Sequence, residues 1–249
     1  AGDGAAASLT NGVGNGTIHQ NATGVSGATN ITQSVNQNSG FSITKFTGHA
    51  SGGAFPHNLD STPNWVLIKN LSDSQHWTVW HSSIAGKYGF LSLNNPFSNN
   101  ISAAQFPTAP SNSIISFGTD TNNGGSASHN FVCYAWNGKS GVSAFGTYSG
   151  GTSISATTNF EPKLIIIKNI SSSEDWVMLD AFRGFKSTSL PNPPALFPSD
   201  PSAEITGSSS NYYHITTSSS GFTVGDAGDV PNGINDGSSS TNYIYMAFA

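Results

Sequence analysis

Charged side chains are scarce in this chain of 249 residues. They make up 8% of the sequence, against about 25% in an average globular protein. Thirteen acidic residues and eight lysines and arginines leave a formal net charge of −5, and no lysine or arginine precedes Lys45. Because a nucleic-acid-binding surface needs a basic patch or stripe, this composition excludes nucleic acid as an expected partner.

Cysteines and long hydrophobic runs are lacking as well. Cys133 is the only cysteine, which excludes an intrachain disulfide and a thiolate metal cluster and fits assembly in a reducing compartment. No apolar run approaches the roughly 20 residues that span a bilayer, so no membrane insertion is expected. Residues 1–8 contain neither a methionine nor the charged region of a signal peptide. We therefore expect the sequence to be part of a longer chain.

What the chain does contain is typical of an all-β protein. Apolar residues make up 36% of it and aromatic residues 11%, which is enough to build a core. They occur in short runs of β-branched and aromatic side chains, separated by Gly, Ser, Asn and Pro. Such runs predict strands, and no segment has the periodicity of an amphipathic helix.

An internal repeat organises most of the sequence. Residues 64–81 and 163–180 align without a gap at an offset of 99. Each contains an apolar run, a polar turn and a second run, which predicts a β-hairpin. Three further blocks match in the same order, and ordered matches indicate two tandem copies of one unit. The blocks are 40–48 with 141–150, 116–120 with 223–226, and 130–136 with 242–248.

The repeat predicts two tandem β-sandwiches, at residues 41–138 and 139–249. An arm or linker rich in Gly, Asn and Thr would precede them at residues 1–40, with one strand near Ile31. In the last strand of each copy both alternating sets of side chains are apolar, so neither face is expected to be freely solvated. This pattern favours a packed array or an oligomer.

The two copies share few groups that could perform chemistry. His76 and His81 align with Asp175 and Asp180, so charged positions change where apolar positions match. Glycoside hydrolysis needs a pair of carboxylates beside the scissile bond, and no such pair is visible on one strand. Glu174 is expected in a solvated hairpin loop with an ordinary pKa. No catalytic residue is predicted, and the chain is expected not to be an enzyme.

An oxygen-rich loop in the second copy is a candidate calcium site. Ca²⁺ prefers six to eight oxygen ligands, and Asp226, Asp229 and Asp236 could contribute to such a shell. The alternative is an ordinary Asp- and Gly-rich turn between two strands. No other cofactor is expected.

Aromatic side chains could belong to the core or contact a ligand. Trp77, Trp80 and Trp176 lie on predicted strands, where large aromatic residues usually pack in the core. Loop aromatics without a matched core role are better candidates for ligand contacts. They are Tyr88, Phe90, Tyr212 and Tyr213.

Five motifs of the two copies occur together in a recognisable combination. They lie at residues 40–48, 63–70, 77–81, 175–184 and 243–249, the last reading Tyr-Ile-Tyr-Met-Ala-Phe-Ala. Together they resemble the tandem repeat modules of tail-fibre-like and other structural virion proteins of marine bacteriophages, including cyanophages. The resemblance covers residues 41–249. It implies jelly-roll or concanavalin-like β-sandwiches and a location at the virion surface, outside the cell.

The function implied by this resemblance is that of a non-enzymatic phage surface protein. It would be a tail fibre, or a capsid or tail decoration, that mediates adhesion to the host surface. Its partners would be other virion subunits, further copies in a homo-oligomer such as a trimer, and a host-surface glycan. Two alternatives remain open: a stand-alone, lectin-like carbohydrate-binding module, and a polysaccharide depolymerase.

Overall fold

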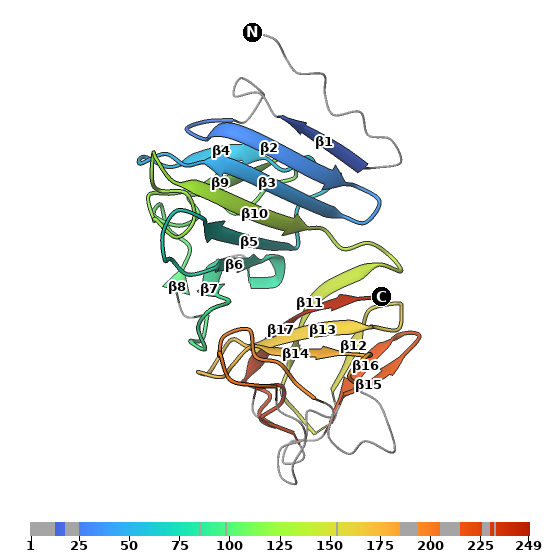
Figure 1. The fold of residues 1–249 in the computed structure, drawn as a ribbon. Helices are drawn as coiled ribbons and strands as arrows, with labels where there is room; N and C mark the ends of the chain where they lie inside the picture. Colours follow the sequence, from blue (N-terminus) through green and yellow to red (C-terminus); the bar gives the residue numbers. More distant parts are fainter. Residues whose placement is uncertain are drawn as a thin grey trace. The chain divides into compact units, whose positions relative to one another are not determined.

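A computed structural model describes most of the chain as strands and turns (Figure 1). The described residues are 13–17, 25–84, 86–97, 99–152, 154–184, 194–204, 215–225, 230–231 and 233–249. Their fold is all-β, with several antiparallel sheets, and this confirms the predicted class. In this part of the chain a short 3-10 turn, η1 (Ser82–Ile84), is the helical element, and no helix is long and apolar enough to cross a membrane.

The chain divides into two compact units, each with its own hydrophobic core. The first unit consists of Ala1–Phe90 and Asn99–Gly138, and the second of Leu91–Ser98 and Lys139–Ala249. The segment Leu91–Ser98 therefore belongs to the second unit although it lies within the sequence of the first.

The first unit contains an eight-stranded antiparallel sheet, in the order β1-β2-β3-β10-β5-β6-β7-β8, and a two-stranded sheet of β4 and β9. The rings of Phe55 in β4 and Phe117 in β9 lie 4.5 and 5.1 Å from that of Phe46 in β3. The small sheet thus packs on the inner face of the large one, as in a β-sandwich. The strands are β1 (Val13–Thr17), β2 (Thr29–Asn36), β3 (Phe41–Thr47), β4 (Gly53–Pro56), β5 (Trp65–Asn70), β6 (Thr78–His81), β7 (Lys87–Phe90), β8 (Asn99–Asn100), β9 (Ile114–Phe117) and β10 (Asn130–Trp136).

Two of these strands, β1 and β2, lie in the region predicted as an arm. The strand expected near Ile31 is β2, and Ile31 and Val35 are buried in the core of the first unit. Gln33 between them is also buried, and its Nε2 donates to Thr44 Oγ1 (2.7 Å) and to Pro56 O (3.0 Å). A buried amide with its hydrogen bonds made is tolerated in a core. A strand with few apolar residues can therefore belong to the sheet and direct its buried side chains into the core.

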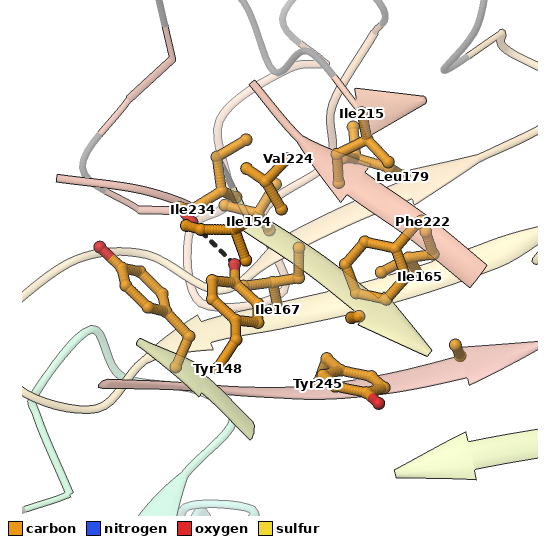
Figure 2. Close-up of a cluster of buried hydrophobic side chains, with 14 of the residues drawn as sticks. Tyr148, Ile154, Ile165, Ile167, Leu179, Ile215, Phe222, Val224, Ile234 and Tyr245 are labelled. Carbon is orange, nitrogen blue, oxygen red and sulfur yellow. Dashed lines mark hydrogen bonds between the residues drawn. The ribbon is translucent and has the colours of Figure 1, made fainter. Parts of the chain in front are cut away.

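The second unit contains a four-stranded sheet in the order β11-β17-β13-β14 and a three-stranded sheet in the order β12-β16-β15. Side chains from both sheets form one buried cluster (Figure 2). Within it the hydroxyl of Tyr148 donates to Ile234 O at 2.7 Å, so its polar atom is satisfied. The strands are β11 (Ser143–Ser149), β12 (Ile154–Thr157), β13 (Leu164–Asn169), β14 (Val177–Asp180), β15 (Ile215–Ser218), β16 (Gly221–Val224) and β17 (Asn242–Phe248).

Both faces of β17 are buried, as its alternation predicts. Tyr243 and Tyr245 point into the core of the second unit, while Ile244 and Met246 on the opposite face are 0% and 5% exposed. The strand therefore buries side chains on two sides.

The matched segments 64–81 and 163–180 form hairpins with the same turn chemistry. β5 pairs with β6 and β13 with β14, both antiparallel, as predicted. Asn70 Oδ1 accepts hydrogen bonds from two turn amides at 2.9 and 3.1 Å, and Asn169 Oδ1 does so at 2.9 and 3.0 Å. Such side-chain acceptors fix the backbone of a turn, which explains why asparagine ends the first strand of each hairpin.

Candidate binding surface

A short turn after β14 presents Phe182 to solvent. Asp180, the last residue of β14, fixes this turn because its Oδ1 accepts from the amides of Phe182 and Arg183, both at 3.0 Å. Arg183 Nε donates to Asp180 Oδ2 at 2.6 Å, and its Nη1 donates to Glu204 Oε1 at 3.2 Å. Backbone and side chains together hold the turn in one conformation.

The charge of Asp180 supports this arrangement at neutral pH. Partial burial acts to raise the pKa of Asp180, but the hydrogen bonds and the positive charge of Arg183 outweigh burial, and the pKa is lowered. The carboxylate therefore stays ionised and continues to accept the hydrogen bonds that shape the turn.

Phe182 is fully exposed, at 105% of the reference area. Exposed aromatic residues on rigid supports are typical anchors of binding surfaces. The residue 99 positions earlier, in the first unit, is Ser83, whose amide donates to His81 Nδ1 at 3.1 Å. The turn can therefore form without an aromatic residue, and Phe182 is a property of the second unit alone.

Four half-buried aromatic rings form a second aromatic surface, on the outer face of the eight-stranded sheet. The Trp136 ring lies 5.0 Å from Phe41 and 6.1 Å from Tyr134, and Trp77 lies 6.3 Å from Tyr134. Three of the ring pairs are stacked, with interplanar angles between 14° and 27°, and the pair of Phe41 and Trp136 is tilted by 32°. We call these four residues the outer aromatic row.

The prediction that Trp77 belongs to the core is wrong. Trp80 and Trp176 are buried, but Trp77 is only partly buried. Trp77 comes directly before β6 and Trp80 lies within it, three residues later, and if the alternation of β6 extends back to Trp77, the two residues are on opposite faces. Trp80 therefore packs in the core while Trp77 joins the outer face.

A family match covers both units and the strands β1 and β2, since it extends over residues 13–249. The chain belongs to the DUF7483 family. This family is described as a domain of unknown function. No curated protein and no solved structure matches the chain.

Two of the four aromatic residues proposed as loop ligand contacts, Tyr88 and Phe90, lie on the strand β7 of this DUF7483 domain and not in a loop. Tyr88 is 8% exposed and packs in the core of the first unit. Phe90 is half-buried, with its ring edge-on to Tyr88 at 5.6 Å. Tyr212 and Tyr213 lie outside the described residues.

The aspartates proposed as calcium ligands can be placed only in part. Asp226 and Asp229 lie outside the described residues. Asp236 is described, and its carboxylate accepts hydrogen bonds from Ser238 N (2.9 Å) and Thr241 Oγ1. Both of its oxygens thus serve the turn before β17, which is the alternative weighed for this loop. Among the described residues, no three His, Cys, Asp or Glu side chains form a group that could hold a metal ion.

Two other reactive groups have altered acidity. The prediction of an ordinary pKa for Glu174 is wrong, because partial burial raises it even though Lys168 nearby acts to lower it. Complete burial raises the pKa of Cys133, so its thiol stays protonated and is a poor nucleophile.

Proposed function

We propose that this DUF7483 domain is a non-enzymatic surface protein of a phage particle, either a tail fibre or a capsid or tail decoration, that attaches the particle to its host. The repeat motifs support this proposal through their resemblance to virion modules. The virion surface, outside the cell, is the corresponding location.

Phe182 is the observation that carries the attachment role. An aromatic side chain has few rotatable bonds, and Asp180 already fixes the turn that carries Phe182. Binding would therefore cost little conformational entropy. Aromatic anchors of this kind supply much of the free energy in protein interfaces. In the first unit, the turn at the matched position forms with Ser83 and without an aromatic ring.

The finer architecture is part of the same proposal. We infer that the two units are tandem copies of one jelly-roll or concanavalin-like module, a view supported by the equivalent turns at Asn70 and Asn169. The chain would associate with other virion subunits and with copies of itself, for example as a trimer. Oligomers convert several weak contacts into strong attachment through avidity.

The direct test compares Phe182→Ala with Val142→Ala in binding of the labelled chain to marine bacterial cells. Val142 is also an exposed apolar residue, at 37%, and serves as the matched control. We expect Phe182→Ala to weaken binding at least about tenfold, as loss of a hot-spot side chain does, and Val142→Ala to have little effect. Equal binding by both variants would remove the basis of the proposal.

A carbohydrate-binding module is the second candidate, and the exposed ring of Phe182 favours it. Sugar rings stack on accessible aromatic faces, and the ligand would then be a host-surface glycan. A glycan array with the wild-type chain and Phe182→Ala distinguishes a glycan from a protein receptor. Reducing ends released from host polysaccharide would instead indicate a depolymerase and contradict the non-enzymatic role.

Calcium binding by Asp226, Asp229 and Asp236 stays a hypothesis. It predicts a lower melting temperature in EDTA than in calcium for the wild-type chain, and no such difference for Asp229→Asn.

A further inference from the structure

In the second unit, residues 91–97 cover the end of the hairpin formed by β13 and β14. Lys168 Nζ donates to Asn94 O at 3.0 Å, and Phe97 N donates to Ile170 O at 3.1 Å. The segment therefore binds through its backbone. The carbonyl of Asn94 accepts from Lys168, and the amide of Phe97 donates to the carbonyl of Ile170.

Side chains complete this contact. The Phe97 ring meets Trp176 at 5.9 Å with an interplanar angle of 61°, and the two residues are 1% and 0% exposed. Lys168 is fully buried, and its Nζ also donates to Asn169 O and Glu174 O. Three carbonyl acceptors satisfy the three donors of the ammonium group. The site on the second unit is thus filled.

The first unit has the same three site positions, at an offset of 99: Lys69, Leu71 and Trp77. We call them the hairpin-end site. They are more exposed than their counterparts: Leu71 is 53% exposed, and Lys69 and Trp77 are partly buried. Lys69 Nζ donates to Gln75 O at 2.6 Å, one carbonyl where its counterpart has three. This site has the chemistry of the filled site but a more accessible surface.

The chain also carries a second copy of the segment that fills the site. Residues 92–96 read Ser-Leu-Asn-Asn-Pro, and residues 189–193 read Ser-Leu-Pro-Asn-Pro, so four of five positions are identical. Residues 189–193 lie outside the described residues. Each chain therefore has two sites and two segments, of which one pair is joined within the second unit.

We propose that the hairpin-end site of the first unit binds residues 189–193 of a second copy of this chain. The segment is uncharged, like the one bound in the second unit, and would present a backbone carbonyl to Lys69. Phe97 follows residues 92–96, whereas Pro194 follows residues 189–193. A proline has no amide N–H and no aromatic ring, so the contact between two chains would be weaker than the contact within the second unit. Site and segment are different surfaces, so the contact is heterologous and can extend into an array. This interface does not depend on the attachment role proposed above.

Sedimentation velocity of the full chain over a range of concentrations tests the proposal. We expect reversible association of the wild-type chain, weakened at least about tenfold by Leu71→Asp or by replacing residues 189–193 with Gly and Ser. Lys87→Met, which changes an exposed lysine of β7, is the matched control and should leave association unchanged. Since Leu71 is exposed, Leu71→Asp should keep the wild-type melting temperature.

A synthetic peptide of residues 187–197 provides an independent measurement. It should bind the full chain and inhibit association, and it should fail to bind Leu71→Asp. Absence of association up to the solubility limit, or association unaffected by Leu71→Asp, would overturn the proposal. The proposal would also be overturned if Leu71 were required for binding a glycan but not for self-association, because the site would then be a glycan-binding site.

Discussion

Replacing Phe97 by alanine should destabilise the second unit, although residue 97 lies in the sequence of the first. Phe97 is 1% exposed, and its ring packs on Trp176 in the second unit. The change removes the ring but keeps the hydrogen bond from the amide of residue 97 to Ile170 O. The effect should therefore reflect the lost packing.

The expected loss in free energy of unfolding is about 3–5 kcal/mol, the usual cost of Phe→Ala in a core. The edge-on contact with Trp176 accounts for about 0.5–1.5 kcal/mol of this beyond simple burial. Since 1.4 kcal/mol corresponds to a factor of about ten, protected amides of the second unit should exchange at least about 100-fold faster.

Hydrogen exchange measured by mass spectrometry can assign the effect to one unit. Phe106→Ala is the matched control, because Phe106 is 0% exposed and packs in the core of the first unit. We expect Phe97→Ala to accelerate exchange in β13, β14 and β17, and Phe106→Ala to accelerate it in β3, β5 and β10. Faster exchange of the first unit alone in Phe97→Ala would refute the placement of this segment.

Three further predictions concern single buried groups. Burial lowers the pKa of Lys168 to about 8 from an ordinary 10.5, so the unfolded chain binds more protons between these values and stability should rise with pH there. Urea unfolding should show this rise, as much as about 3 kcal/mol, in the wild type and not in Lys168→Met. Burial also lowers the pKa of His57 below 6.5, although its hydrogen bond to Ser111 O opposes this. Stability should therefore fall as pH drops below 6.5, and fall less in His57→Gln. Cys133 should resist thiol reagents in the folded chain and react fully in denaturant; rapid labelling of the native protein would contradict its burial.

Local sequence patterns were sufficient to predict the hairpins. The runs at β5 and β13 are short, β-branched and followed by polar turns, so strand, turn and strand could be read in order. The side chains of Asn70 and Asn169 accept hydrogen bonds from amides two and three residues later. Sequence patterns are informative over such short separations. The double apolar alternation of β17 likewise predicted burial on both faces.

Contacts between distant residues could not be predicted in this way. β2 packs in the core through Gln33, whose amide is satisfied by Thr44 and Pro56 O, and composition alone counts glutamine as a surface residue. The docking of Phe97 on Trp176 joins positions far apart in the chain, which no local pattern encodes.

Phe182 shows a limit of reasoning from matched positions. Phe182 also lacks a matched core role, because the residue 99 positions earlier is Ser83. The predicted candidates were Tyr88, Phe90, Tyr212 and Tyr213, and Phe182 was not among them. Asp180 and Arg183 shape its turn through their hydrogen bonds, and the exposed ring is what this turn supports.

Immunoelectron microscopy of intact phage particles tests the central claim most directly. An antibody raised against the Phe182 turn, residues 180–184, should label the surface of particles that contain this chain, and Phe182→Ala should reduce attachment of the same particles to cells. Labelling confined to disrupted particles or to host-cell lysate would contradict a role at the virion surface.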